Sequence, residues 1–240
     1  MNYYFITGAS KGLGRAIADI LLKDSSNFVF GYSRTSTITH QQYYHKNIDF
    51  SNIELVQKIK FPELKNAEQL ILINNAGVIS ESKHFGNMNS KKIIEGYTVN
   101  LIAPSILCNE FIQCYKAYSC NKKIINISSG AAQSPIDGWG VYCASKAGID
   151  MMSKVLAEEN KIGKTNFQFL SIAPGIIDTE MQQQIRKSDV SNFSNLNRFV
   201  DYKTSNSLET PEKTAKNVLQ LINDSKQFSK VVCSVKDLTE

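Results

Sequence analysis

The sequence predicts an α/β protein whose parallel sheet carries helices on both faces. Short runs rich in Val, Ile, Phe and Tyr recur along the chain without the polar alternation of a half-exposed strand. Stretches with apolar residues at helical spacing stand between these runs, and a glycine-rich turn follows the first run directly. Right-handed crossovers between such strands give a doubly wound, Rossmann-type arrangement.

The individual elements follow from these patterns in order. The first helix is expected where Leu13, Ile17 and Leu21 recur on one face. Strands are expected at Tyr3–Thr7, Asn27–Tyr32, around Ile48, Leu70–Asn74, Lys122–Ser128, Asn166–Ile172 and Lys230–Val235. Helices are expected at Gly12–Lys23, Lys91–Tyr118, Tyr142–Asn160 and Pro211–Asn223, with small helices that close over a ligand in Asp178–Ser207. No repeat or composition break divides the chain, so one domain is expected to span residues 1–240.

Bulk composition narrows the class of protein. The chain is 42% apolar and 20% charged, an ordinary globular balance. Its net charge of +5 comes from scattered Lys and Arg, which argues against a nucleic-acid partner and suits an anionic cofactor. No segment is apolar and long enough to cross a membrane and no leader pattern opens the chain, so we expect no membrane partner and a cytoplasmic location.

The 5 cysteines form no C-x-x-C pair and are expected to be reduced thiols. The 3 histidines lack ligand-like spacing, so no metal is predicted.

The turn after the first predicted strand is a candidate phosphate site. The segment from Thr7 to Gly14 reads T-G-A-S-K-G-L-G, and its glycines allow a tight turn and a close approach of the backbone to a pyrophosphate. The positive end of the following helix would face that group. The spacing differs from G-x-G-x-x-G, so a glycine-rich turn that binds nothing remains the alternative. The cofactor-binding residues expected in this turn are Gly8, Ser10, Lys11, Gly12, Leu13 and Gly14.

The end of the second predicted strand indicates which dinucleotide is bound. Enzymes of this fold that use NAD carry an acid there for the ribose 2′-hydroxyl, whereas this chain reads Gly31-Tyr-Ser-Arg-Thr35. Ser33 and Arg34 are therefore expected to bind the 2′-phosphate of NADPH, with Lys11 in reach of the same group. The alternative is that both cations are ordinary surface residues. Asp49 and Phe50 are expected beside the adenine.

Tyr142 and Lys146 form a candidate catalytic pair at the start of a predicted helix. Their spacing of four residues places both side chains on one face. An ammonium close to the phenol favours the phenolate and would lower the pKa of Tyr142. Proton donation from Tyr142 to a developing alkoxide then becomes feasible. Such a pair is also common on helix surfaces, so the spacing alone is weak evidence.

Polar residues at the ends of two neighbouring predicted strands support this site. Ser128 and Ser129 end one buried strand, and Asn75, Ala76 and Gly77 follow the other. Carboxyl ends of parallel strands line the ligand crevice of such a sheet. Asn100 lies in the long helical region between them. It either makes a helix–helix contact or holds a water that relays protons to Lys146.

Taken together, these motifs resemble the short-chain dehydrogenase/reductase family over essentially the whole chain. T-G-x-x-x-G-x-G, N-N-A-G, the helix Asn, the Ser, Y-x-x-x-K and P-G occur in the family's order. The resemblance implies that Tyr142 is the proton donor and that Ser129 hydrogen-bonds the substrate carbonyl. It also implies that Lys146 lowers the Tyr pKa and holds the nicotinamide ribose, and that Asn100 orders the relay water. The resemblance further implies carboxamide-binding residues in the P-G loop at Pro174, Gly175, Ile177 and Thr179.

A narrower resemblance links the chain to sepiapterin reductases and bacterial benzil reductases. It rests on the segments Ser128–Gly130, Gly138–Cys143, Ala173–Gln182 and Asn195–Phe199. Sepiapterin reductases carry an acid near the last strand that anchors the pterin. Val232–Val235 has none here, and Asp237 is out of register, which favours a diketone or another aromatic ketone. The expected substrate residues are Ser129, Trp139, Tyr142, Gly175 and Met181, although Trp139 and Met181 would also suit core packing.

The sequence therefore predicts an NADPH-dependent carbonyl reductase acting on a small molecule. Two alternatives remain open, namely an NADP-dependent alcohol dehydrogenase working in the oxidative direction and a non-catalytic NADPH-binding regulator. A regulator would be expected to lose a member of the Asn, Ser, Tyr and Lys set, and all four are present. By resemblance alone, a homodimer is expected through the helices that carry Asn100 and Tyr142.

Overall fold

The computed structural model describes residues 1–238 and contains one sheet of seven parallel strands. Their order is β3-β2-β1-β4-β5-β6-β7, and the strand order reverses between β1 and β4. The strands are β1 (Asn2–Thr7), β2 (Asn27–Ser33), β3 (Tyr43–Asn47), β4 (Gln69–Asn74), β5 (Asn121–Ile127), β6 (Phe167–Ala173) and β7 (Val232–Ser234). The predicted doubly wound sheet is confirmed, and the ligand crevice of such a sheet opens where the order reverses.

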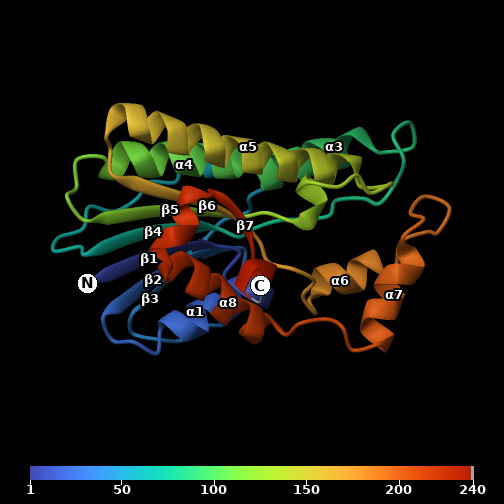
Figure 1. The fold of residues 1–240 in the computed structure, drawn as a ribbon, viewed down its shortest axis with the longest axis horizontal. Coiled ribbons are helices and arrows are strands. Elements are labelled where there is room, and N and C mark those ends of the chain that lie inside the picture. The colour runs from blue at the N-terminus through green and yellow to red at the C-terminus, as the bar shows by residue number, and fades with distance from the viewer. Residues whose placement is uncertain (239–240) are drawn as a thin grey trace.

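Helices cover both faces of the sheet, as predicted (Figure 1). One layer is made of α3 (Ser90–Tyr97), α4 (Ala103–Tyr115) and α5 (Gly140–Gly163), with α2 (Ile53–Gln57) beside them. The other layer is made of α1 (Gly12–Leu21) and α8 (Pro211–Asn223). Two short helices, α6 (Glu180–Ile185) and α7 (Leu196–Thr204), extend from one end of the sheet and lie within the predicted 178–207 stretch.

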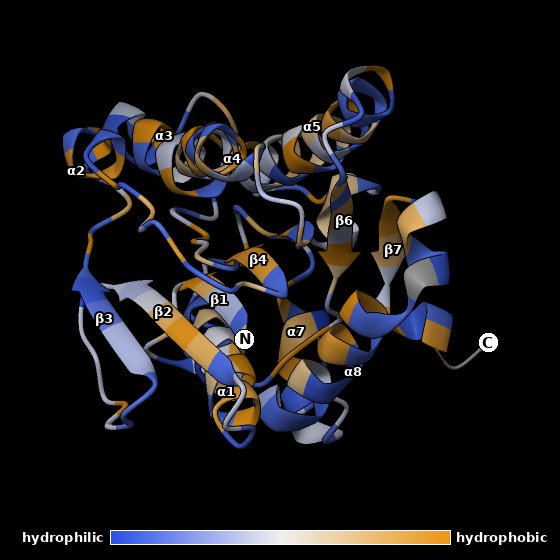
Figure 2. Cartoon of the chain, turned by 90° about the vertical axis from the view of Figure 1, so that its left-hand side faces the viewer, coloured by the Kyte–Doolittle hydropathy of each residue, from blue (hydrophilic) through white to orange (hydrophobic). Residues whose placement is uncertain are grey.

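The strands supply two hydrophobic cores, one on each face of the sheet. In β1, Tyr4 and Ile6 pack against α1 and α8, whereas Tyr3 and Phe5 pack toward α4. Because successive side chains of a strand point to opposite faces, a strand buried on both faces needs apolar residues at every position. Figure 2 shows the apolar strands lying between the two helical layers. This is the physical reason for the unbroken apolar runs in the sequence.

Both edges of the sheet differ from the sequence expectation. The third strand is Tyr43–Asn47 and ends before Ile48, and it is exposed beyond its first residue. An edge strand with a solvated face carries polar residues such as His45 and Lys46, so it lacks the apolar run that marks a central strand. The last strand is confined to Val232–Ser234. Helix α2 was not expected from the sequence.

The predicted long helix over Lys91–Tyr118 is interrupted in its middle. It begins at Ser90, passes through a π-helical turn at Thr98–Ile102 and ends at Tyr115. The turn places Asn100, which is 1% exposed, against the backbone of Val78. Wide turns of this kind occur frequently at functional sites.

Other features of the described chain bear on the class of protein. All 5 cysteines are free thiols. Within residues 1–238 no helix is both long and apolar enough to span a membrane. The same residues contain no cluster of His, Cys, Asp and Glu that could hold a metal ion.

Candidate active site

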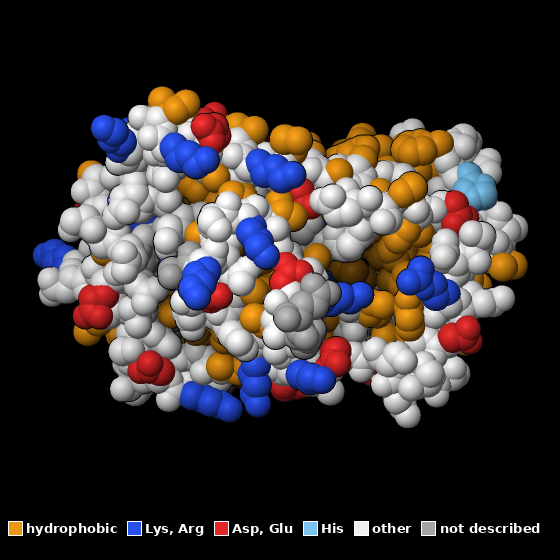
Figure 3. Space-filling view, viewed as in Figure 1, with side chains coloured by type: hydrophobic (Ala, Val, Ile, Leu, Met, Phe, Trp, Pro, Cys, Tyr) orange, Lys and Arg blue, Asp and Glu red, His pale blue; other side chains and the backbone are white. Residues whose placement is uncertain are grey.

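A cleft of about 1250 Å³ runs along the carboxyl ends of the strands. Figure 3 shows a hollow walled by apolar side chains beside α6. Every residue predicted to bind cofactor or substrate lines this cleft except Gly14, and every predicted catalytic residue lines it except Asn100. Segments far apart in the sequence therefore meet at one site, as the topological switch between β1 and β4 dictates.

The glycine-rich turn has the geometry of an anion cradle. Gly8 and Gly12 adopt φ angles of +70° and +56°, which residues with a Cβ rarely adopt. Gly14 lies behind the turn, where a Cβ would approach the carbonyl oxygen of Gly8 to 2.4 Å. No described side chain caps the start of α1, and its first turn contains no acid. Its first-turn N–H groups are therefore available to an anion, so the turn fits a pyrophosphate.

The predicted Asn75–Gly77 segment is fastened to this turn. The Thr7 hydroxyl oxygen accepts hydrogen bonds from the backbone N–H groups of Asn75 and Ala76, each at 2.9 Å. The Asn75 side-chain amide in turn donates to the carbonyl oxygens of Thr7 and Gly8, at 3.0 and 3.2 Å. The ends of β1 and β4 therefore form one rigid wall of the cleft.

Ser33, Arg34, Asp49 and Phe50 line the far end of the cleft, as expected for an adenosine site. Arg34 is exposed and forms no salt bridge within residues 1–238. Hydrogen bonds from Ser51 hold the pKa of the Asp49 carboxyl below its ordinary value, and the Arg34 charge adds to this. Lys11 differs from expectation because its ammonium pairs with Glu180 on α6. A 2′-phosphate would have to compete with that carboxylate for Lys11.

Lys146 is buried on α5, one turn after Tyr142. Only 5% of it is exposed, and its ammonium donates a 2.7 Å hydrogen bond to the carbonyl oxygen of Ile127 at the end of β5. Burial lowers the pKa of Lys146 to about 8, against an opposing attraction from the Asp150 carboxylate. The ammonium lies 5.8 Å from the centroid of the Tyr142 ring.

The environment of Tyr142 corrects one sequence expectation. Burial raises the pKa of its phenol above the ordinary value, and hydrogen bonding with Ser129 lowers it by less. The expectation that Lys146 lowers this pKa is wrong for the structure as it stands, because burial has the largest effect and Lys146 is not among the groups that shift it. The phenol is protonated at neutral pH, as a proton donor must be, and the raised pKa makes it a weaker acid than a free tyrosine.

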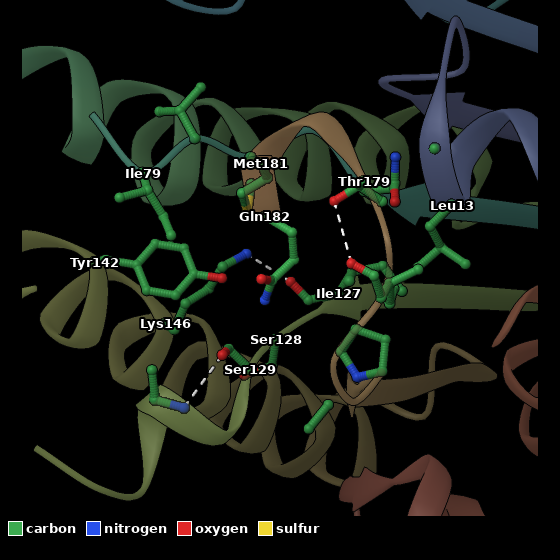
Figure 4. A pocket seen from close by; sticks show the side chains of 18 of the residues that line it. Leu13, Ile79, Ile127, Ser128, Ser129, Tyr142, Lys146, Thr179, Met181 and Gln182 are labelled. Carbon is green, nitrogen blue, oxygen red and sulfur yellow. Dashed lines mark hydrogen bonds between the residues drawn. The ribbon is translucent and has the colours of Figure 1, made fainter. Parts of the chain in front are cut away.

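Ser129 faces the same space as Tyr142 (Figure 4). Its hydroxyl oxygen accepts a 3.2 Å hydrogen bond from the backbone N–H of Ala131, within the short helical turn Gly130–Ala132. That contact leaves the Ser129 proton to be donated elsewhere. The neighbouring Ser128 hydroxyl also lines the cleft, is buried and has no hydrogen-bond partner in residues 1–238.

Asn100 lies behind the cleft rather than in its wall. Its side-chain oxygen accepts from the N–H of Val78 at 2.9 Å, and its amide donates to the Val78 carbonyl at 2.9 Å and to Ser145 at 3.3 Å. A Cβ added to Gly77 would lie 3.5 Å from the Asn100 oxygen and 3.6 Å from the Lys146 ammonium nitrogen. Asn100 and Lys146 are therefore neighbours, and the relay water stays a prediction.

Sequence reasoning missed Asp150, which lies a further turn along α5. It is 4% exposed and accepts hydrogen bonds from Gln133 at 2.8 Å and Ser171 at 2.6 Å. Tyr142, Lys146 and Asp150 repeat at intervals of four, so helical spacing could have indicated it. Its carboxylate opposes the effect of burial on the Lys146 pKa.

The substrate end of the cleft is mostly apolar. Trp139 and Met181 both line it, and Trp139 also packs against the rings of Phe193 and Phe199, with centroids at 5.2 and 5.1 Å. Trp139 is therefore both a pocket wall and a core residue. Asp237 was judged out of register from the sequence, yet it lines the cleft, where its carboxylate accepts from the N–H of Ser234 at 3.0 Å.

The fold and this site define a dinucleotide-dependent oxidoreductase. A family model described as short chain dehydrogenase matches residues 2–190. The chain therefore belongs to the short-chain dehydrogenase family, whose members use a nicotinamide cofactor.

Relatives that carry the names of reductases match most of the chain or nearly all of it. A benzil reductase ((S)-benzoin forming) of Bacillus cereus is 35% identical, covering 92% of this chain and 94% of the relative. The Bacillus subtilis (strain 168) enzyme of the same description is 34% identical, covering 96% and 97%. A sepiapterin reductase of Rattus norvegicus is 32% identical, covering 77% and 78%.

Solved structures confirm the fold. The KRED1-Pglu enzyme shares 26% identity and superposes with a TM-score of 0.79, covering 92% of this chain and 94% of its own. A short chain dehydrogenase/reductase from Saccharomyces cerevisiae, 22% identical, superposes with a TM-score of 0.85 over 98% and 96%.

The buried ammonium predicts a specific pH dependence of stability. Below pH 8 a charged Lys146 destabilises the folded protein by about 3 kcal/mol, since its folded pKa of about 8 lies below its ordinary 10.5. Between pH 8 and pH 10.5 the unfolded chain binds more protons at Lys146 than the folded protein does. The free energy of unfolding therefore rises with pH until Lys146 is uncharged in both states. In the cofactor-free protein, the melting temperature of Lys146→Met relative to wild type should therefore decline from pH 8 to pH 10.

Thermal unfolding over this pH series measures the difference. Lys154→Met, at an exposed position of the same helix, is the control and should show no such trend. A Lys146→Met difference that stayed constant from pH 7 to pH 10 would show that the ammonium is not destabilised by burial.

Proposed function

We propose that this protein is a carbonyl reductase that transfers hydride from NADPH to a ketone, with Tyr142 as the proton donor. The observation that carries the proposal is the meeting of a half-buried phenol, a serine hydroxyl and a buried ammonium at the apolar end of a dinucleotide cleft. The names of the benzil and sepiapterin reductase relatives support the same reaction class.

The proposed chemistry assigns a role to each polar group. NADPH, when bound, supplies the hydride. Tyr142 and Ser129 donate hydrogen bonds to the carbonyl oxygen, where negative charge develops as the carbon is reduced. Tyr142 then gives its proton to that oxygen, and the product is an alcohol. Lys146, beside Asn100 and its proposed water, returns a proton to the phenolate and holds the nicotinamide ribose.

The remaining cleft residues would hold the cofactor. The glycine turn receives the pyrophosphate, Asp49 and Phe50 border the adenine, and the Asn75–Gly77 wall lies beside the nicotinamide half. The loop residues Pro174, Gly175, Ile177 and Thr179 would fix the carboxamide. Because β2 ends without an acid and Arg34 has no salt bridge in the described chain, a 2′-phosphate is favoured over a free ribose hydroxyl. Glu180 weakens the case for Lys11 as a second phosphate ligand.

The walls of the substrate end favour a bulky, aromatic ketone or diketone. Trp139 and Met181 present apolar surface, and Gly175 leaves room beside them. The Asp237 carboxylate also lines the cleft and accepts one hydrogen bond, from the Ser234 N–H, through one of its two oxygens. We further propose, as the sequence predicts, one domain over residues 1–240 acting in the cytoplasm.

The outer face of α5 supports the proposed homodimer. Met151 and Val155 lie one turn apart on this helix and are 59% and 47% exposed. Ile102, 42% exposed, lies in the neighbouring π-helical turn, and α4 runs beside α5 along the same side of the molecule (Figure 1). Two such faces packed together would remove this apolar surface from water.

Replacement of the proton donor tests the mechanism. Tyr142→Phe removes the phenolic proton and keeps the ring, so kcat for a diketone should fall below about a tenth of the wild-type value. NADPH affinity, measured by fluorescence titration, should change little. Retention of a larger kcat would refute Tyr142 as the donor.

Replacement of Arg34 tests the cofactor assignment. Arg34→Ser should raise the KM for NADPH by about 10- to 100-fold, since a charge-assisted, two-point contact with the phosphate is lost. The KM for NADH serves as the internal control and should stay within about twofold. Equal changes for both cofactors would show that Arg34 does not contact the 2′-phosphate.

The dimer is tested by charge reversal on α5. Light scattering coupled to size exclusion should give a mass near twice the 26.8 kDa chain for wild type. The double variant Met151→Glu/Val155→Glu should elute as a monomer, because burying two carboxylates in an apolar interface is costly. Val190→Glu, at an equally exposed site in a loop, is the control. A monomeric wild type would refute the proposal.

A further inference from the structure

Gln182 is a buried amide that the mechanism above does not use. It lies on α6, is 6% exposed and lines the cleft. Its side-chain oxygen accepts one long hydrogen bond, 3.5 Å, from Arg186. Its amide nitrogen has no hydrogen-bond partner within residues 1–238. The amide nitrogen opens onto the cleft, so it is available to donate a hydrogen bond to a ligand bound there.

The direction of the side chain shows where that ligand would lie. In Figure 4 the Gln182 amide reaches from α6 into the space between Tyr142 and the two serines, Ser128 and Ser129. Tyr142 enters this space from α5. The buried, unpartnered hydroxyl of Ser128 faces the same cleft. Two sets of donors therefore face one space.

Apolar side chains also line this end of the cleft. Ile79, Trp139, Met181 and Ile185 line it, and three of them are less than 9% exposed. A ligand that satisfies both donor sets must therefore carry two oxygen acceptors close together with apolar groups outside them. A 1,2-dicarbonyl compound has this pattern, since its two adjacent C=O groups lie between two substituents.

We propose that Gln182 donates a hydrogen bond to the second oxygen of a 1,2-diketone and thereby selects diketones over simple ketones. This inference rests on the proposed carbonyl reductase function. One carbonyl is held by Tyr142 and Ser129, and its carbon accepts the hydride while its oxygen takes the Tyr142 proton. The other carbonyl stays bound to Gln182 and is not reduced, so the product is an α-hydroxy ketone. A simple ketone leaves the buried amide unsatisfied, which is the usual physical basis of such discrimination.

The test compares two substrates that differ only at the second oxygen. Benzil carries two carbonyl groups between two phenyl rings, and deoxybenzoin has a methylene in place of one of them. Gln182→Leu keeps the size of the side chain and removes the donor. At saturating NADPH, kcat/KM for benzil should fall about 10-fold or more, whereas kcat/KM for deoxybenzoin should stay within about threefold.

Gln184→Leu is the matched control on the same helix. The Gln184 amide donates to the carbonyl oxygen of Ile79 and does not line the cleft, so its loss should leave the benzil-to-deoxybenzoin ratio unchanged. Gln182→Met, which also removes the donor, is a second variant. If both variants lowered kcat/KM for benzil and for deoxybenzoin by the same factor, the inference would be overturned. A wild-type protein that reduces neither compound would instead refute the proposed function.

Binding gives a second readout that does not depend on turnover. Trp139 is the only tryptophan of the sequence and lines this end of the cleft, so its fluorescence reports ligand binding there. With NADP⁺ present, Gln182→Leu should raise the Kd for benzil about 10-fold and leave the Kd for deoxybenzoin nearly unchanged. An unchanged benzil Kd would overturn the role of Gln182 in substrate binding.

Discussion

The site depends on one buried contact, the hydrogen bond between the Lys146 ammonium and the carbonyl oxygen of Ile127. An ammonium with 5% exposure is costly unless it is satisfied, and a strand-end carbonyl is an available partner. This contact fixes the start of α5 against the end of β5. Because Tyr142 lies one turn before Lys146, the same contact determines where the phenol enters the cleft.

A chain of buried side-chain hydrogen bonds holds α5 in this position farther along its length. The Asn74 amide donates to the Asn126 oxygen, and the Asn126 amide donates to the Ser153 hydroxyl, both at 2.8 Å. These residues come from β4, β5 and α5, so the two strands and the helix are linked in the core. Together with the Thr7–Asn75 contacts, the network joins the phosphate turn to the catalytic helix. The cleft is thus bounded on both sides by groups that the sheet itself positions.

Much of this arrangement could be predicted from the sequence, because it depends on short-range spacing and on topology. The apolar runs identify central strands, and the carboxyl ends of parallel strands must share one edge, which brings Ser129 near Tyr142. Features set by the local environment could not be predicted. The pairing of Lys11 with Glu180 joins residues far apart in the chain. The raised pKa of Tyr142 depends on how deeply the phenol is buried in the folded protein. The polar edge strand β3 and the π-helical turn at Asn100 leave no periodic pattern to detect.

Helix α6 shows how packing rather than charge positions the substrate wall. Its residues Glu180 and Gln182 are separated by about 200° around the helix axis, so they point to nearly opposite sides. Glu180 reaches Lys11 in the glycine turn, but both side chains are more than half exposed, and such ion pairs contribute about 0–1 kcal/mol. Ile185, 3% exposed, instead packs in the cluster that contains Trp139 and Phe193. The apolar cluster that forms the pocket wall therefore also fixes the helix that carries Gln182. A substitution in this cluster would alter the substrate end of the cleft and leave the dinucleotide end, which is built on β1 and β4, largely intact.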